Sequence, residues 1–475
     1  MVNWNNSYAR LPERFFARVR PTPVAAQRLI RWNQKLAEQL GFEPAGLEMP
    51  GEPIAMAYAG HQFGHFVPQL GDGRAILLGE VLDRDGKRFD IQLKGSGPTP
   101  YSRRGDGRAA LGPVLREYVV SEAMAALGIP TTRALAALST GEFVRREVPL
   151  PGAMFVRVAA SHVRIGTFQY FAARRDADGV RVLADYVIAR HYPECADAPN
   201  RYRALLDAVV RRQAELIARW MMVGFIHGVM NTDNMSVSGE TIDYGPCAFM
   251  DAYHPGRVYS SIDSAGRYAF GNQPRIAQWN LARLAETLLG LLADEEAAAI
   301  REAEAAIGMF SGHFEAAYAR GMRRKLGLFE ERAEDLKLAE DLLDCMSRGD
   351  ADFTLTFRGL CDAAVSSDVD DSLRRVFAES GEIDEWLKRW RERVAGESIG
   401  GEGRRAAMRA VNPKFIARNH LVEEAIVAAV DGGDFQPFET LLAVLSSPYE
   451  DQPEFGRCAL APRPEQIVKH TFCGT

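Results

Sequence analysis

The segment from residue 227 to residue 245 constrains the fold of this chain more than any other. It begins with His227, carries Asn234 seven positions later, and ends in Asp-Tyr-Gly at 243–245. The residues between Asn234 and Asp243 predict a short hairpin, with Ser-Gly at 238–239 as its turn. We therefore expect Asp243 to be delivered to the same site as Asn234, where an amide and a carboxylate suit magnesium or manganese.

The order of these residues is similar to the catalytic loop of protein kinases, which runs H-R-D-L-x-x-x-N and is followed by D-F-G. Val229 occupies the position of the catalytic aspartate. A valine side chain can neither orient a hydroxyl group nor accept its proton. The loop alone leaves two interpretations open: the chain has lost catalysis, or it runs a different reaction on a kinase-like fold.

Upstream of this loop, apolar runs predict a small antiparallel sheet. The runs at 65–70, 75–82 and 88–94 are expected to form three consecutive strands, with Asp-Gly at 85–86 as a hairpin turn. Lys94 ends the third strand. A glycine-containing turn, a strand, a second turn and a strand that ends in lysine follow one another in the first lobe of a kinase.

The turn between the first two strands is suited to phosphate. Gly71 and Gly73 would let backbone N–H groups approach phosphate oxygens closely, and Arg74 adds a fork of donors. A plain hairpin turn is the competing interpretation of these glycines.

A polar loop and a helix follow Lys94. The loop is rich in glycine and arginine and contains a second Gly-Asp-Gly-Arg at 105–108. The helix is predicted to start with Pro113 in its first turn and to end before Gly128. Glu117 lies in its early turns, where a kinase places the glutamate that pairs with the strand lysine. A solvated helix glutamate is the alternative.

The apolar run at 154–159 predicts a further strand, and it carries one arginine, Arg157. Burying an unpaired guanidinium is costly, so Arg157 is expected to meet a carboxylate or a phosphate. A structural salt bridge is the competing interpretation. Arg164 follows a few residues later.

The second half of the chain is predicted to be mainly helical. Residues 202–223 have helical periodicity, and helices fill most of 276–446, with breaks near Gly308, Gly349, Gly400 and Asn412. No catalytic motif is found there. The predicted class is α+β: a protein-kinase-like two-lobed fold with a β-rich N-lobe, a helical C-lobe and an added C-terminal helical extension.

The expected division of the chain has four parts. These are an N-terminal extension (1–60), a kinase-like N-lobe (61–160), a kinase-like C-lobe with the catalytic and metal loops (161–290), and C-lobe helices with a helical extension and a cysteine-containing tail (291–475).

Composition narrows the possible partners and location. The net charge of -6 provides no global positive field for collecting nucleic-acid phosphates. No apolar run is long enough to span a bilayer, and no signal peptide is evident. The six cysteines include no C-x-x-C pair, which argues against a zinc site or a secreted disulfide framework. We expect a cytoplasmic monomer that binds neither nucleic acid nor membrane.

Several longer strings resemble those of one family. They are Gly60-His-Gln-Phe-Gly64, Pro68-Gln-Leu-Gly-Asp-Gly-Arg74, Thr99-Pro-Tyr-Ser-Arg103, Gly128-Ile-Pro-Thr-Thr-Arg133, His227 to Ser236, Asp243-Tyr-Gly-Pro246 and Gly271-Asn-Gln-Pro274. In these strings the chain resembles selenoprotein O (YdiU-type) proteins, a family of kinase-fold pseudokinases. The resemblance covers nearly the whole chain. It implies protein AMPylation, the transfer of AMP from ATP to Ser, Thr or Tyr hydroxyls, with ATP held in reverse orientation.

The resemblance also implies roles for individual residues. Asp233 would be the proton acceptor, Asn234 and Asp243 would bind Mg²⁺ or Mn²⁺, and Glu117 would orient Lys94. The residues implied as nucleotide contacts are Gly71, Gly73, Arg74, Lys94, Asp106, Gly107, Arg157, Arg164 and Asp243.

The chemistry agrees with this assignment. Attack at the α-phosphorus expels pyrophosphate, and a metal, Lys94 and several arginines would stabilise the charge that develops on it. Asp233 could take over the hydroxyl-orienting role that Val229 cannot perform. Two alternatives stay open: a kinase-type phosphotransferase and a non-catalytic nucleotide-binding pseudokinase.

One regulatory feature of the family is left open. Many members carry a redox-active cysteine or selenocysteine third from the C-terminus, and Cys473 holds that place. Some pair it with a cysteine in the segment after Asp-Tyr-Gly. Residues 248–270 contain no cysteine, although Cys247 lies close in sequence.

Overall fold

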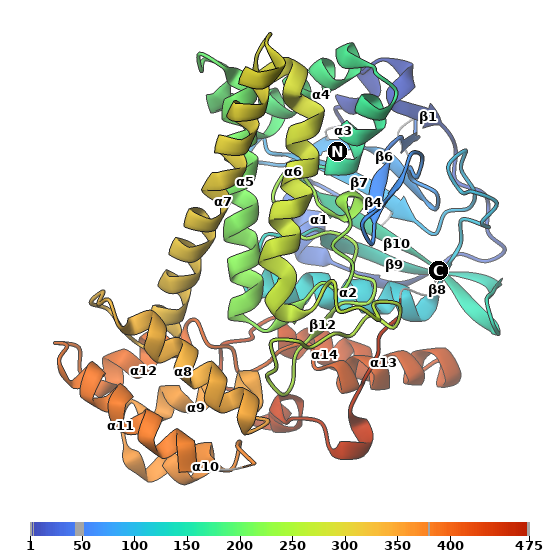
Figure 1. Cartoon of the computed structure of the whole chain (residues 1–475). Coiled ribbons are helices and arrows are strands. Elements are labelled where there is room, and N and C mark those ends of the chain that lie inside the picture. Colours follow the sequence, from blue (N-terminus) through green and yellow to red (C-terminus); the bar gives the residue numbers. More distant parts are fainter. Residues whose placement is uncertain (1, 3, 43–51, 379–380, 473–475) are drawn as a thin grey trace.

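The computed structural model describes residues 2, 4–42, 52–378 and 381–472. It is an α+β protein in which one antiparallel sheet packs beside a large set of helices (Figure 1). The predicted α+β class is therefore confirmed. Cys473 lies outside the described residues.

The main sheet contains strands from both sides of the expected boundary at residue 60. Its order is β1 (Phe16–Arg18), β3 (Ile54–Met56), β6 (Ala75–Leu82), β7 (Arg88–Lys94), β10 (Pro149–Ala159), β9 (Arg133–Arg145) and β2 (Arg28–Trp32), and β8 (Ala109–Ala110) also pairs with β10. Neighbouring strands along this order are antiparallel.

Strands β6 and β7 form the predicted hairpin with the predicted bounds. The backbone N–H of Gly86 donates to the carbonyl of Asp83 at 3.0 Å, as in a tight turn. The strand pairing places Lys94 opposite Ala75. Apolar side chains such as Ile76 and Ile91 are fully buried, so the strand pattern in the sequence reflects burial of the sheet.

The prediction for residues 65–70 is wrong. Instead of joining β6, strand β5 (His65–Val67) pairs with β4 (Gly60–Gln62) in a separate two-stranded sheet. A local turn at Phe63 and Gly64, both with positive φ, makes this pairing possible. The neighbour of β6 is instead β3. All three residues of β3 are buried, whereas His65 and Phe66 of β5 are exposed, so β3 suits this buried position beside β6 better.

Helices confirm most of the sequence prediction. α2 (Leu111–Ala126) carries Glu117 and packs on the sheet. α5 (Arg201–Met222) confirms the helix predicted at 202–223, with bounds that differ by one residue. α5 packs against α4 (Ala177–His191), α6 (Gln273–Leu292) and α7 (Glu296–Lys325) (Figure 1). The shorter α3 (Ile165–Ala173) packs against α4 and α6.

The expected break at Gly308 is wrong, since α7 runs through it. Gly308 is exposed and nothing lies within 4 Å of the position its Cβ would take. One exposed glycine costs a helix only about 1 kcal/mol relative to alanine. The contacts of α7 with α5 and α6 outweigh that cost.

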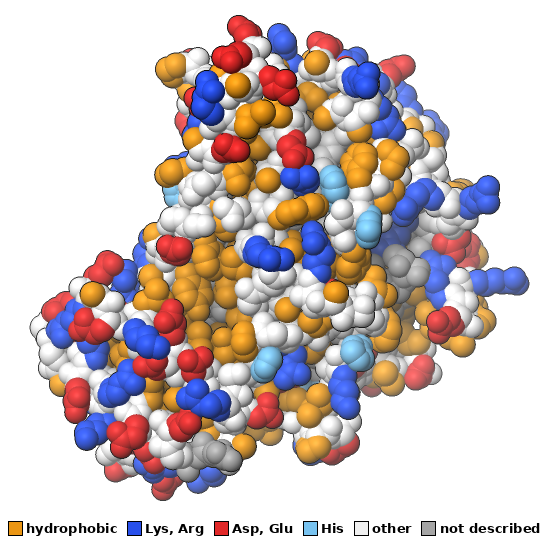
Figure 2. Space-filling model, in the orientation of Figure 1, with side chains coloured by type: hydrophobic (Ala, Val, Ile, Leu, Met, Phe, Trp, Pro, Cys, Tyr) orange, Lys and Arg blue, Asp and Glu red, His pale blue; other side chains and the backbone are white. Residues whose placement is uncertain are grey.

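A second group of helices extends from the end of α7, at the lower left of Figure 1. It comprises α8 (Asp335–Arg348), α9 (Phe353–Ala363), α10 (Asp370–Arg374), α11 (Gly381–Ala395) and α12 (Gly401–Arg409). The breaks predicted near Gly349, Gly400 and Asn412 are confirmed. Trp386 and Trp390 are buried in a hydrophobic cluster that also includes Ile226, Ala248 and Met322 from outside this group. Figure 2 shows acidic and basic side chains interspersed over its surface.

The last two helices return to the helix that carries Glu117. α13 (Asn419–Gly432) and α14 (Gln436–Leu445) both contact α2 (Figure 1). The rings of Tyr118 and Phe438 meet edge to face with centroids 5.6 Å apart. The predicted helical region of 276–446 thus contributes to the support of α2. None of the helices among the described residues is long and apolar enough to cross a membrane.

Candidate active site

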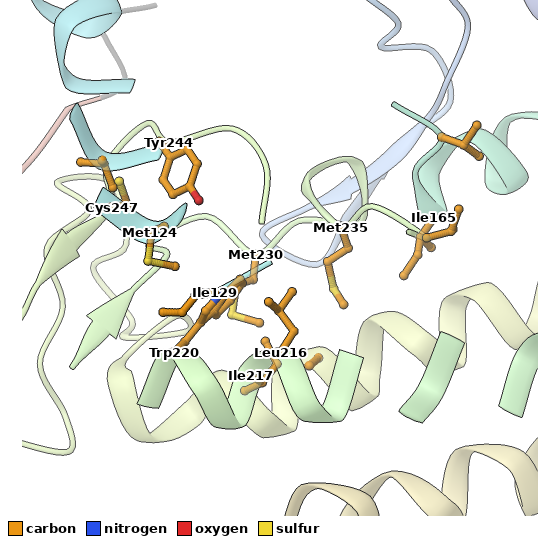
Figure 3. Packing of buried hydrophobic residues seen from close by; sticks show 14 of the residues in the cluster. Met124, Ile129, Ile165, Leu216, Ile217, Trp220, Met230, Met235, Tyr244 and Cys247 are labelled. Atoms are coloured by element: carbon orange, nitrogen blue, oxygen red, sulfur yellow. The ribbon is translucent and has the colours of Figure 1, made fainter. Parts of the chain in front are cut away.

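The segment from His227 to Gly245 is anchored by buried side chains on both sides of its polar residues. Figure 3 shows Met230 and Met235 pointing toward Leu216, Ile217 and Trp220 of α5. These apolar contacts hold the backbone, so the polar residues between and after them have defined positions.

His227 has a structural position in this segment. Its ring stacks on that of Trp220 at 5.4 Å, and its Nε2 is 2.9 Å from the backbone oxygen of Ile242. His227 is fully buried. The histidine therefore ties the start of the segment to the residue before Asp243.

The predicted hairpin between Asn234 and Asp243 is wrong, although its turn exists. The N–H of Gly239 donates to the carbonyl of Ser236, but Ser236 bridges to Arg164 and Thr241 bridges to Thr131. The two arms pair with other parts of the chain because each finds a strand-like partner outside the segment. Asp243 nevertheless reaches the cavity that also contains Asn234.

That cavity has a volume of about 500 Å³ and brings together residues far apart in sequence. Sequence-predicted residues that line it are Gly73, Arg74, Lys94, Glu117, Arg157, Arg164, Asp233, Asn234 and Asp243. Val229 also lines it. The position that lacks a carboxylate therefore faces the same space as the carboxylate of Asp233.

Asp243 is the centre of a buried ion cluster. Its Oδ1 accepts from Arg157 at 2.5 Å and lies 3.4 Å from Lys94 Nζ, and its Oδ2 accepts from Arg164 at 2.7 Å. Burial alone would raise the pKa of Asp243. The guanidinium groups of Arg157 and Arg164 outweigh burial and hold that pKa well below its usual range. The backbone of Asp243 has φ of 63°, a conformation uncommon outside glycine and frequent at functional sites.

Lys94 and Arg157 are joined to α2 through one glutamate. Lys94 Nζ is 2.5 Å from Glu117 Oε2, and Arg157 donates to Glu117 Oε1 at 3.1 Å. The predicted contact between Glu117 and Lys94 is confirmed. The expectation that Arg157 meets a carboxylate is confirmed as well, since it meets two. Three cations thus share two carboxylates at the inner end of the cavity.

Asp233 lies in a different environment from Asp243. It is buried, and burial raises its pKa to about 6 against the opposing charge of Arg164. Gln62 donates to its Oδ2 at 3.3 Å. Its Oδ1 has no hydrogen-bond partner among the residues that the structure describes. This oxygen is buried and lies against Gly60, so the Asp233 carboxylate keeps one oxygen without a hydrogen bond from the described part of the chain.

The β4–β5 hairpin holds the residues around Asp233. The N–H of His61 donates to Thr232 Oγ1 at 2.7 Å, and the N–H of Phe63 donates to Asn231 Oδ1 at 3.0 Å. Together with the contact from Gln62, three consecutive loop residues are bonded to one hairpin. The mispredicted strand is therefore part of the site.

The donor set at Asn234 and Asp243 fits a hard divalent cation. Asn234 Nδ2 donates to the backbone oxygen of Val229 at 3.0 Å, which leaves the amide oxygen to serve as a ligand. Magnesium is often held by one or two protein oxygens together with phosphate oxygens and waters. The Asp243 carboxylate, kept ionised by the surrounding cations, meets the same requirement.

Gly71, Asp106 and Gly107 are not in the main cavity. They line an adjoining cavity of about 540 Å³, which shares Tyr58, Gly73, Arg74 and Arg103 with it. Asp106 accepts from Arg146 at 2.9 Å. The two glycine motifs therefore face one continuous region from two sides, although the structure does not gather all predicted nucleotide contacts around Asp243.

Sequence reasoning missed several polar residues of the site. Arg164 lies over the ring of Tyr58 at 4.6 Å, and Asp72 Oδ2 accepts from the N–H of Met56 and from Gln92. Burial raises the pKa of Asp72 to about 6. Asp72 lies between Gly71 and Gly73, which the sequence had indicated as nucleotide contacts, and this position was the signal that could have pointed to Asp72. No local pattern pointed to Tyr58 or Gln92.

Comparison with known proteins shows which family the chain belongs to. The family described as "Protein adenylyltransferase SelO" matches residues 1–446. The chain is 63% identical over 486 residues to "Protein nucleotidyltransferase YdiU" of Rhodopseudomonas palustris (strain BisB18), and 62% identical over 492 residues to the protein of that name from Methylorubrum populi. Each alignment covers 99% of both chains. The chain therefore belongs to the SelO/YdiU family and is an enzyme of the nucleotidyltransferase type.

Proposed function

We propose that this protein transfers AMP from ATP to Ser, Thr or Tyr hydroxyls of other proteins and releases pyrophosphate. The family description names an adenylyltransferase acting on protein, which supports the donor and the acceptor class. The observation that carries the proposal is the convergence of Lys94, Arg157 and Arg164 on Asp243 within one cavity that also contains Asp233.

The cation cluster suits the leaving group of this reaction. Lys94, Arg157 and Arg164 converge on Asp243, and Glu117 also pairs with Lys94 and Arg157. Guanidinium forks match phosphate oxygens. Cations held in place by Glu117 would bind the β- and γ-phosphates and stabilise the charge that develops as pyrophosphate departs.

Asp233 would accept the proton of the attacking hydroxyl. The hydroxyl oxygen forms a bond to the α-phosphorus, the bond from that phosphorus to the oxygen it shares with the β-phosphate breaks, and the proton passes to the Asp233 carboxylate. A pKa of about 6 keeps the carboxylate ionised at neutral pH while leaving it basic enough to take a proton.

Asn234 and Asp243 would hold the divalent metal, Mg²⁺ or Mn²⁺. When bound, the metal would supply positive charge against the phosphate oxygens of ATP. Lys94, Arg157 and Arg164 would then be released from Asp243 to contact phosphate directly, because one carboxylate cannot satisfy all of these cations and a metal.

We also propose that the α+β fold is a variant of the two-lobed protein-kinase arrangement. The β6–β7 hairpin ends in Lys94, Lys94 pairs with Glu117 of the following helix, and the His227 segment leads to Asp243. These parts follow the order found in kinases. The site would differ in placing its acceptor carboxylate at Asp233.

Labelled ATP tests the proposed reaction. The full-length protein is incubated with a proteome extract and with ATP labelled at the α- or at the γ-phosphate, with Mg²⁺ or Mn²⁺. We expect protein-bound label from α-labelled ATP only, and a mass increase of one AMP on Ser, Thr or Tyr. Transfer from the γ position alone would show a kinase, and ATP binding without any transfer would show a non-catalytic pseudokinase.

A further inference from the structure

A second cavity is built from residues that do not line the candidate active site, and most of its charged lining residues are cations. Its volume is about 380 Å³, and its walls come from the end of α2, from α5 and α7, and from Val411 and Tyr449. The charged residues that line it are Arg219, Arg320, Arg324 and Lys325, with Glu215 as the one carboxylate. Arg219, Arg320 and Arg324 are exposed to solvent, whereas Lys325 is buried.

These cations lack acidic partners. Among the described residues, no carboxylate lies within ion-pair distance of Arg219, Arg320, Arg324 or Lys325. Arg219 donates to the backbone oxygen of Gly128 at 3.3 Å, which places its guanidinium at the cavity wall. By contrast, Arg323 of the same helix pairs with Glu331 at 3.0 Å. On the last turns of α7, Arg320 and Arg324 line the cavity without a carboxylate partner in the described part of the chain, whereas Arg323 is paired outside it.

Lys325 adds a cation that is shielded from solvent. It is only 2% exposed, and its Nζ donates to Asn412 Oδ1 at 2.7 Å. Its Nζ also lies over the ring of Phe357 at 4.0 Å, and burial lowers its pKa to about 7. The positive charge of the cavity therefore comes mainly from Arg219, Arg320 and Arg324.

The cavity walls are held by specific contacts. Gly321 allows α7 to approach α5, since a Cβ there would be 2.6 Å from the sulfur of Met222. Tyr449 donates its hydroxyl to the backbone oxygen of Leu127 at 3.1 Å. Leu127 directly follows α2, the helix that holds Glu117. A ligand here would therefore contact the end of the helix that orients Lys94.

We propose that this cavity is a second binding site, for a small anion that carries phosphate groups. Its volume lies within the range of roughly 300–1,000 Å³ found for small-molecule sites. Arg219, Arg320 and Arg324 offer planar forks of donors, which phosphate oxygens accept in pairs. The site is independent of the proposed transfer reaction, because it is formed by other residues and needs no catalysis to be occupied.

Calorimetry with pyrophosphate as the probe tests the proposal on the full-length protein at low ionic strength. The test variant is the double substitution Arg320→Ala, Arg324→Ala. The matched control is Arg323→Ala, which removes a cation from the same helix but outside the cavity. Any pyrophosphate bound at the candidate active site contributes equally to all three proteins, so their difference reports the second cavity.

We expect wild type and Arg323→Ala to show a binding event that the double variant has lost or weakened at least tenfold. Ala317→Leu, which places a larger side chain on the cavity wall and keeps every cation, should weaken the same event. Thermal melts confirm that each variant is folded. Superimposable isotherms for wild type and the double variant would overturn the proposal, as would sulfate binding as tightly as pyrophosphate.

Discussion

Gly60 lies against the carboxylate of Asp233, so closely that a Cβ at position 60 would be 2.4 Å from Asp233 Oδ1. Side-chain atoms do not approach this closely without displacement. The glycine is therefore required by the position of the carboxylate, and the β4–β5 hairpin and the His227 segment form one unit around it.

Gly60→Ala is expected to displace Asp233 and lower turnover by about 10- to 100-fold, since a shift on the order of 1 Å can cost that much. ATP affinity should change little, because the Asp243 cluster is formed by other contacts. Single-turnover transfer and ATP titration measure the two effects. Gly290→Ala is the control: Gly290 is exposed in α6 and nothing lies within 4 Å of its Cβ position. Equal activity of Gly60→Ala and wild type would contradict the prediction.

Asp243 and Asp233 are expected to fail in different ways when substituted. Asp243→Ala should abolish metal-dependent ATP binding and transfer together, because it removes the carboxylate on which Lys94, Arg157 and Arg164 converge. Asp233→Asn should keep ATP affinity and slow transfer by about 10²- to 10⁴-fold, the usual contribution of a general base. Titration of ATP with and without Mn²⁺, alongside initial rates, separates them. The division of roles is wrong if both variants lose affinity to the same extent.

The pH dependence of transfer should report Asp233. The reaction needs its carboxylate form, so kcat/KM should rise with pH, reach half its limit near the pKa of about 6, and level off above it. The hydrogen bond from Gln62 favours the charged form and lowers this pKa. Gln62→Ala should therefore move the acid limb to higher pH. An unchanged midpoint in Gln62→Ala would show that another group controls the limb.

Arg418 is expected to matter for stability rather than for chemistry. It is fully buried and pairs with Asp352 at 2.5 Å and with Asp251 at 2.7 Å. Arg418→Met would leave two carboxylates without their cation and should destabilise the fold by about 3–5 kcal/mol. Urea unfolding measures the loss. Arg463→Met, which breaks the exposed pair with Glu465, is the control and should leave the midpoint unchanged.

Much of the local structure could be predicted because its causes are local. The apolar run at 75–82 and the alternation at 88–94 predicted β6 and β7, and Pro113 and Gly128 bracketed α2. The contact between Lys94 and Glu117 followed from their order in a known arrangement of strand and helix. Gly308 failed as a helix break because its small intrinsic cost is offset by contacts that a single sequence does not display.

By itself, the sequence identified the family and the candidate site residues, namely the cations and the carboxylates Asp233 and Asp243. Only the tertiary structure decided how they differ. Asp243 is surrounded by guanidinium groups, which lower its pKa, whereas Asp233 is buried against Gly60, and burial raises its pKa to about 6. Periodicity and turn residues act over a few positions, but the pKa of a carboxylate depends on groups that are distant in sequence and close in space.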